Sequence, residues 1–223
     1  NLPNPPQAPT IEAVAMPAIG DLLRLTPGAS ITSNGPLGAQ VQVRLRGAEA
    51  NHTLLVVDGM EINDPSTGSE GRFETLLSDS ISRIEIIRGP QSALWGPEAI
   101  GGVISVSTLP VDGSRLRASG EYGSHNHKRL STYASLAADK GGVSVDANIL
   151  KSDGIDISGT HGDKDGVDHR EVGGKAIWQQ ENVEVGMTAR YIRSVNQFDD
   201  FDYNLSKVVD ANMSTMHRWL GVR

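Results

Sequence analysis

The chain has 223 residues, with 25 glycines, 11 prolines, no cysteine and a formal net charge of −7. Its longest strongly apolar run, Leu54 to Val57, is far shorter than the roughly 18 apolar residues of a membrane helix, which excludes a helical membrane protein. The acidic balance argues against a nucleic-acid binder, which needs a basic face. The absence of cysteine excludes disulfide frameworks and thiolate metal sites.

A proline and glycine turn cluster at residues 110–113 divides the chain into two halves of different composition. Residues 1–112 hold 12 acidic and 6 basic residues, all of the latter arginine, whereas residues 113–223 hold 15 and 14. We therefore predict two domains, 1–112 and 113–223.

The first half has the pattern of a small mixed α/β unit. Residues 17–26 have helical spacing and are stopped by Pro27 and Gly28. Asp58-Gly59 predicts a two-residue hairpin turn. Gly101-Gly102 predicts a close backbone approach before the last strand. Strands are predicted at 41–45, 54–57, 81–88 and 103–108, a short helix near Phe73, and exposed polar tips at Ser33 to Gln40 and Asn63 to Gly71.

The second half alternates apolar and polar residues, as half-buried strands do. Its connections alternate between short turns and long loops, the long ones being residues 153–168 and about 20 residues around Phe201. Short turns on one edge and long loops on the other are typical of an outer-membrane β-barrel wall. A soluble antiparallel sandwich gives the same alternation. The six predicted strands are 116–122, 130–136, 143–149, 172–178, 183–191 and 214–222.

A series of short motifs in the first half carries a family resemblance. The motifs are Leu45-Arg46-Gly47, Leu54-Leu55-Val56-Val57-Asp58-Gly59, Ile84-Glu85-Ile86-Ile87-Arg88-Gly89-Pro90, and Ala93-Leu94-Trp95-Gly96 leading to residues 99–104. In this order and spacing they resemble the plug domain of TonB-dependent outer-membrane receptors, over residues 11–109. The segment from Asp21 to Gly28 is similar to the opening helix of that plug.

The resemblance implies an α+β plug domain followed by antiparallel transmembrane β-barrel strands. A barrel wide enough to be plugged has about 22 strands. Six strands cannot close around a plug, and an open edge in lipid leaves backbone groups unpaired. We therefore expect these residues to be the N-terminal part of a longer, 22-stranded plugged barrel.

The function that the resemblance implies is TonB-dependent active import of a scarce small-molecule nutrient across the bacterial outer membrane. The implied partners are the inner-membrane TonB complex, which pulls on an N-terminal segment, and outer-membrane lipid. No enzyme is expected, because the sequence has neither a phosphate-cradling loop nor a nucleophile elbow. The alternatives are a non-transporting receptor fragment or signalling and binding module of the same family, and an adhesive soluble sandwich.

Transferred to this sequence, the family pattern places substrate contacts on the two polar tips. Residues 10–15 have some of the character of a TonB box, but they lie closer to Asp21 than the family places its box. We interpret Ile11 to Val14 as the first plug strand and expect the box upstream of Asn1 or absent. The predicted substrate-binding residues are Ser33, Asn34, Gly35, Leu37, Gln40, Asn63, Asp64, Ser66, Thr67 and Ser69.

Arg44, Arg46 and Arg88 are the predicted plug–barrel ion-pairing residues. A guanidinium can pair bidentately with carboxylates on a surrounding wall. The alternative is that these three arginines make local ion pairs within the plug.

Aspartates gather in the two predicted long loops, where a hard cation such as Ca²⁺ would neutralise them. The alternative is that these aspartates are turn formers in solvated loops. The arrangement resembles the vitamin B12 branch of the family, so cobalamin is the leading substrate and a ferric chelate the other; beyond structural Ca²⁺ no cofactor is expected. The candidate metal ligands are Asp156, Asp163, Asp165, Asp168, Asp199 and Asp202.

Overall fold

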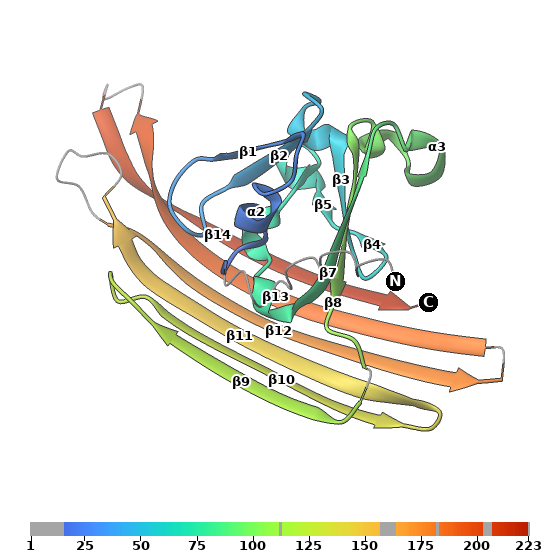
Figure 1. Cartoon of the computed structure of the whole chain (residues 1–223). Helices are drawn as coiled ribbons and strands as arrows, with labels where there is room; N and C mark the ends of the chain where they lie inside the picture. Colours follow the sequence, from blue (N-terminus) through green and yellow to red (C-terminus); the bar gives the residue numbers. More distant parts are fainter. Residues whose placement is uncertain (1–15, 112, 157–163, 182, 203–206, 223) are drawn as a thin grey trace, which may run out of the picture.

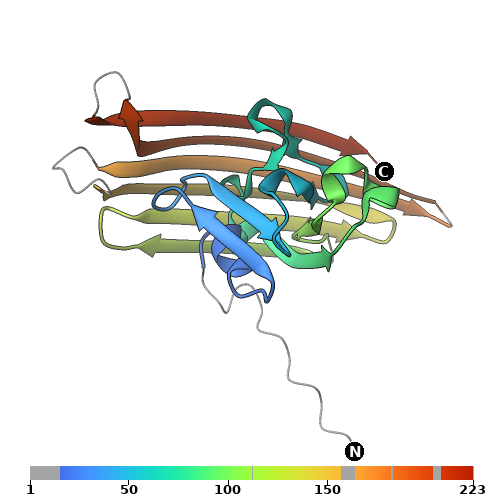
Figure 2. The same cartoon turned by 90° about the horizontal axis from the view of Figure 1, so that it is seen from above.

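The computed structural model describes residues 16–111, 113–156, 164–181, 183–202 and 207–222, with the side chains of 67, 200–202 and 207–210 not described. Residues 16–111, called the plug below, lie in the concave face of a six-stranded sheet, called the wall (Figure 1). Viewed from the plug side, the wall strands run side by side beneath it (Figure 2). The candidate TonB box and the predicted first strand at 11–14 lie outside the described residues.

The plug is built around a four-stranded sheet of order β4-β3-β8-β7, in which β3 and β8 are parallel. Two hairpins, β1 with β2 and β5 with β6, complete its strands. The strands are β1 (Ala29–Ser33), β2 (Val41–Leu45), β3 (Thr53–Val57), β4 (Met60–Glu61), β5 (Asn63–Asp64), β6 (Glu70–Gly71), β7 (Ile81–Arg88) and β8 (Gly102–Thr108). The helices are α2 (Ile19–Leu23), α3 (Ser92–Trp95) and the short 3-10 turns η1 (Ala50–His52), η2 (Pro65–Thr67), η3 (Phe73–Thr75), η4 (Ser78–Ser80) and η5 (Pro97–Ala99).

Strand β3 is the centre of the plug core, and all five of its residues are buried. Such a strand is covered on both faces, which explains why Leu54 to Val57 reads as a continuous apolar run. The predicted hairpin after it is confirmed, with Asp58 at φ 49° and Gly59 at φ 85°. Gly102 is also confirmed as a close approach, because a Cβ there would meet the Ile87 carbonyl and lie 2.8 Å from Leu45 Cδ1.

The wall consists of six antiparallel strands, each paired with its neighbours in sequence. All six predicted strands are present, but the two long loops are shorter than predicted. The β11–β12 and β13–β14 hairpins extend well past their apolar stretches, because backbone pairing does not require an apolar face. The strands are β9 (Arg115–Tyr122), β10 (Lys128–Ala138), β11 (Gly141–Ile155), β12 (Asp165–Gln180), β13 (Val183–Asp202) and β14 (Lys207–Val222).

The outer face of the wall is mostly apolar and exposed, while its inner face is mostly polar and buried. This polarity is the reverse of a soluble sandwich and fits strands that cross a bilayer. No helix among the described residues has the length and apolar content to cross a membrane. The exposed outer residues include Leu116, Leu130, Leu136, Val143, Val145, Ile149, Val172, Trp178, Val185, Met187, Leu220 and Val222.

Val145→Arg tests the lipid-facing assignment. Val145 is 51% exposed and lies in the middle of the apolar stretch of β11, between Ala134 and Gly174. We expect the arginine to lower the free energy of unfolding in lipid vesicles by about 2–4 kcal/mol, measured by urea titration of the receptor that carries this chain. Val145→Leu is the matched control, and equal stability of the two variants would contradict the assignment.

Candidate functional site

The candidate functional site is the polar contact between the plug and the inner face of the wall. Alternation along each strand turns every second side chain toward the plug. In a protein interior such groups must find hydrogen-bond or ion partners. The buried polar side chains of this face are Ser131, Ser135, Asp146, Asn148, Asp165, His169, Glu171, Arg190, Ser194, Asn196 and Thr215.

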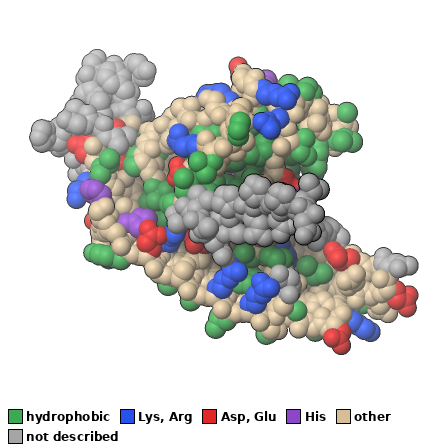
Figure 3. Space-filling view, viewed as in Figure 1, with side chains coloured by type: hydrophobic (Ala, Val, Ile, Leu, Met, Phe, Trp, Pro, Cys, Tyr) green, Lys and Arg blue, Asp and Glu red, His purple; other side chains and the backbone are tan. Residues whose placement is uncertain are grey.

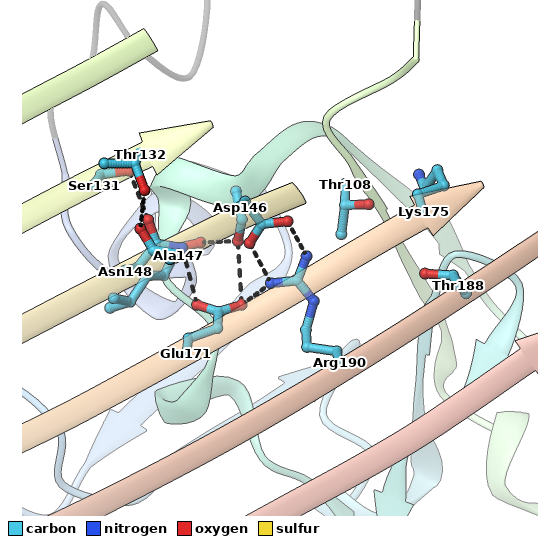
Figure 4. Close-up of polar contacts among 12 residues, drawn as sticks. Thr108, Ser131, Thr132, Asp146, Ala147, Asn148, Glu171, Lys175, Thr188 and Arg190 are labelled. Carbon is cyan, nitrogen blue, oxygen red and sulfur yellow. Dashed lines mark hydrogen bonds and ion pairs between the residues drawn. The ribbon is translucent and has the colours of Figure 1, made fainter. Parts of the chain in front are cut away.

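An ion cluster lies at the centre of this face (Figure 4). The guanidinium of Arg190 forms a fork with the Asp146 carboxylate, with both N–O distances 3.0 Å, and also pairs with Glu171. Asn148 donates to Glu171 at 3.4 Å, and Ser131 donates to Asn148 at 2.6 Å. The cluster therefore joins β10, β11, β12 and β13 and sets two carboxylates against one guanidinium.

Two further residues shape the cluster. His169 is 2% exposed, and its Nε2 lies 3.8 Å from the Glu171 carboxylate. Gly173 makes room for the Arg190 fork, because a Cβ at this position would lie 2.5 Å from Arg190 Nη2 and 2.6 Å from Asp146 Oδ1.

The plug reaches the wall first through the β3–β4 turn. The Asp58 carboxylate accepts hydrogen bonds from the backbone and side chain of Thr108, and it pairs with Lys175 of β12 at 3.0 Å. Thr188 of β13 donates to the same carboxylate at 3.4 Å. Burial raises the pKa of the Asp58 carboxyl, but the Thr108 hydrogen bonds and the Lys175 charge outweigh it and lower the pKa overall. The Asp58 carboxylate thus links strand β8 of the plug to the wall strands β12 and β13.

A second contact is made by η4. Ser80 donates to Glu171 at 3.3 Å, so the plug touches the ion cluster itself. Asp79 pairs with Arg129 of β10 at 3.7 Å. Burial raises the pKa of the Asp79 carboxyl, and the Arg129 charge offsets this only in part. Both contacts are longer than the Asp58–Lys175 pair.

A third contact runs from Arg72 to β14. Its guanidinium donates to Thr215 Oγ1 at 3.2 Å and to Met213 Sδ at 3.3 Å, and it pairs with Glu74 of the plug at 2.8 Å. Burial raises the pKa of the Glu74 carboxyl against the opposing effect of Arg72. Arg72 is 4% exposed, so its buried guanidinium needs these partners.

The plug–wall ion pairs differ from those predicted. Arg44 bonds to Thr32 and Gln42 within the plug, and Arg88 bonds to the Pro27 carbonyl. Arg46 is exposed, and among the described residues none of the three arginines pairs with the wall. Figure 3 shows basic side chains on the plug surface farthest from the wall.

The ion pairs between the plug and the described wall share one polarity, and the pairing predicted for the three arginines stays a prediction. The plug supplies carboxylates, at Asp58 and Asp79, and the wall supplies cations, at Lys175 and Arg129. The acidic excess of residues 1–112 was the available sequence signal. It could have indicated that the plug would bring negative charge to its partner.

The two predicted substrate tips lie beside each other. Gln40 donates to Glu70 at 3.1 Å, which links the loop between β1 and β2 to the β5–β6 hairpin. Asn34 donates to Gln40, and Ser33 donates to the Gly35 carbonyl. The first tip lies toward the wall end that carries the longer connections (Figure 1).

Asn63 and Asp64 hold the second tip in shape. The Asn63 amide accepts from Leu55 N and donates to the carbonyls of Thr53 and Ser69. Asp64 accepts from the backbone and hydroxyl of Ser66. Burial raises the pKa of the Asp64 carboxyl, but the Ser66 hydrogen bonds outweigh it and lower the pKa overall. The substrate contacts predicted for both tips stay predictions, with the Thr67 side chain outside the described part of the chain.

The candidate metal ligands that the structure describes do not gather into one site. Asp165 and Asp168 are three positions apart on β12, so their side chains point to opposite faces of the wall. Asp168 pairs with Arg170 at 3.0 Å. Among the described residues no group of three or more acidic or histidine side chains is placed to hold a metal ion. Asp163 and the Asp202 side chain lie outside those residues, while Asp156 ends β11 and Asp199 lies in β13.

Comparison with known proteins agrees with this geometry of a plug seated in a curved wall. Residues 7–103 match the family model of the TonB-dependent receptor plug domain. The vitamin B12 transporter BtuB of Vibrio vulnificus is 35% identical over 121 residues, which cover 54% of this chain and 20% of that protein. This chain therefore aligns with only a fifth of that relative.

Solved structures show the same fold. The ferric enterobactin receptor PfeA of Pseudomonas aeruginosa superposes with a TM-score of 0.68 at 24% identity, over 85% of this chain and 34% of that one. The ferric yersiniabactin uptake receptor FyuA of Yersinia pestis gives 0.69 at 20% identity, over 95% and 36%.

The fold and the site thus define a plugged wall of membrane-crossing strands. The chain carries the plug domain of the TonB-dependent receptors over residues 7–103. The chain is located in the bacterial outer membrane.

Lys175→Met tests the Asp58 contact and its pH dependence. The folded-state pKa of Asp58 lies below its ordinary value of 3.8, so the contact stabilises the plug above that pH and is lost as the pH falls through the lowered pKa. We expect the variant to weaken plug binding by about 1–3 kcal/mol at neutral pH, with the difference vanishing once Asp58 is protonated. The measurement is urea-induced release of the plug, followed by fluorescence.

Lys140→Met, in the exposed turn between β10 and β11, is the matched control for loss of a lysine. A pH-independent difference, or an equal effect of the control, would count against the Asp58 contact.

Arg190→Met tests the ion cluster. It leaves the Asp146 and Glu171 carboxylates buried without their cation, which we expect to cost about 3–5 kcal/mol of unfolding free energy. Adding Asp146→Asn and Glu171→Gln removes the uncompensated charge and should restore much of the stability. A single variant as stable as the wild type in urea titration would show that the cluster is solvated rather than buried.

Proposed function

We propose that the receptor carrying this chain imports a scarce nutrient across the outer membrane by a TonB-dependent change in the plug. One observation carries this proposal. Among the described residues, the sheets of the plug and the wall are separate, and the polar contacts between them are made by side chains. The plug can therefore shift or partly unfold without breaking a backbone ladder shared with the wall.

The leading substrate of this proposal is cobalamin. Its support is the 35% identity to a protein named as a vitamin B12 transporter. Ferric chelates are the second substrate class, since the similar solved structures are ferric enterobactin and ferric yersiniabactin receptors. In either case the linked tips around Gln40 and Glu70 present hydroxyl and amide groups suited to a polar ligand.

The TonB complex is the proposed energy source, acting on the chain before α2. Structural Ca²⁺ at the long-loop end of the wall is proposed as an aid to substrate binding, with the aspartates of β12 and β13 divided among more than one site or acting alone. Both proposals rest on the family resemblance and on the placement of the tips.

Uptake of radiolabelled cyanocobalamin tests the proposal. We expect the full receptor, produced in a bacterium without its own vitamin B12 receptor, to import the label only when TonB is present. Gln40→Ala should weaken binding several-fold, and Ca²⁺ chelation should weaken it reversibly. Lys140→Met, far from the tips, is the control.

Each contrary result would contradict a different part of the proposal. Import of a ferric chelate without cobalamin binding would replace the substrate. Substrate binding with no import in TonB-containing cells would contradict transport.

A further inference from the structure

Residues 16–19 are bound to the segment that contains η4. Ala18 and Leu77 form an antiparallel bridge, flanked by hydrogen bonds from Ile19 N to the Leu76 carbonyl at 3.2 Å and from Ser78 N to the Pro17 carbonyl at 3.0 Å. The Ser78 hydroxyl adds a bond of 2.5 Å to the Met16 carbonyl. The first described residues of the chain are thus tied to residues 76–78 by backbone and side chain together.

The same segment makes contact with the wall. Leu77 packs against Leu150 of β11 and Val167 of β12. Immediately after it, Asp79 reaches Arg129 and Ser80 reaches Glu171. Residues 76–80 therefore lie between the beginning of the described chain and the ion cluster, on the side of the plug that faces the wall (Figure 1).

The segment also supports one of the outward tips. Leu37, in the loop between β1 and β2, packs on the cluster formed by Leu77, Leu150 and Val167. The next residue, Gly38, has φ +93°, and a Cβ there would lie 2.6 Å from Asn196 Oδ1 and 2.7 Å from Val167 Cγ2. This tip packs closely against the wall, which leaves no space for a Cβ at Gly38, and Leu77 forms part of the surface it packs on.

The two sets of contacts differ in strength. The bonds to residues 16–19 measure 2.5–3.2 Å and include a backbone pair. The polar contacts to the wall measure 3.3 and 3.7 Å and are made by side chains alone. Shorter, better directed hydrogen bonds are the stronger ones, so under load the wall contacts give way before the bridge.

We propose that Leu76–Ser80 is a coupling segment that joins the N-terminal end of the plug to the substrate tip. Displacement of residues 16–19 carries the segment with it, frees Ser80 and Asp79 from the wall and withdraws Leu77 from beneath Leu37. This inference rests on the proposed TonB-driven import. Its residues act by positioning, and none of them has to touch the substrate.

A disulfide between Ala18→Cys and Leu77→Cys tests whether the two segments move together. The flanking hydrogen bonds make this a non-hydrogen-bonded pair, the closer kind of antiparallel pair and the one suited to a disulfide. The sequence has no other cysteine. We expect the oxidised receptor to import radiolabelled cyanocobalamin at no less than about half its reduced rate; a reversible loss of tenfold or more would show that the segments must separate and would overturn the proposal.

Joining Ser80→Cys to Glu171→Cys with a short bis-methanethiosulfonate reagent tests release from the wall. We expect cobalamin binding to persist while import falls at least tenfold and recovers on reduction. Unchanged import after cross-linking would overturn the proposal. Ser82→Cys treated with the same reagent is the control, because its hydroxyl bonds only within the plug sheet, to Ser107 and Thr108 carbonyls.

Single-molecule force measurement tests the contact between Ser80 and Glu171 without a substrate. When the receptor in a bilayer is pulled from its N-terminus, Ser80→Ala should lower the first rupture force and Ser82→Ala should not. Equal forces would overturn the coupling segment even if import is demonstrated. Lowered force in a receptor that does not import cobalamin would leave the coupling intact and reject only the substrate.

Discussion

The structure depends on one constraint, which is that the wall buries charge on its inner face. Arg190, Asp146 and Glu171 lie where a soluble protein would place apolar side chains, while the apolar side chains face outward. Charges removed from water must be paired, because an isolated buried charge costs several kcal/mol. The plug completes this pairing through Ser80 and shields the cluster from bulk water.

This constraint explains why side-chain contacts hold the plug against the wall without a sheet that the two share. The plug's polar contacts with the wall include a carboxylate at Asp58, a hydroxyl and a carboxylate in η4, and a guanidinium at Arg72. Each is a side-chain interaction worth about 1–3 kcal/mol at most. Together they hold the plug at equilibrium, and none requires the backbone ladder of either sheet to open. The import proposed above needs such an arrangement, because the plug must move while the wall stays intact.

The sequence predicted elements well where local chemistry decides them. Strand β7 matches its predicted range of 81–88, and the Asp58-Gly59 turn follows from the favoured residues of a type I′ hairpin. The ends of β11 to β14 that border the two long loops differ from the prediction, because pairing continues through polar residues where no apolar period marks it. In the same way, Asp165 and Asp199 were assigned to loops although both lie in strands.

The site was harder to predict than the fold. Arginine motifs drew attention to Arg46 and Arg88, whereas the pairs with the wall use Asp58 and Asp79, whose partners lie 117 and 50 positions away in the chain. Such pairing depends on which face each strand turns inward and on how the plug is oriented. Neither can be read from the motif that contains the residue, although the acidic excess of the plug carried part of the answer.

The strand order also bears on how the molecule folds. In the wall every strand pairs with the next one along the chain, so it can grow one hairpin at a time with short loops to close. The plug instead needs β3 to find β8 in parallel, with about 45 residues between them. Closing that distant pair costs more chain entropy than any step in the wall. We therefore expect the plug sheet to form after the wall hairpins, and the Ser80 contact with the ion cluster to follow it.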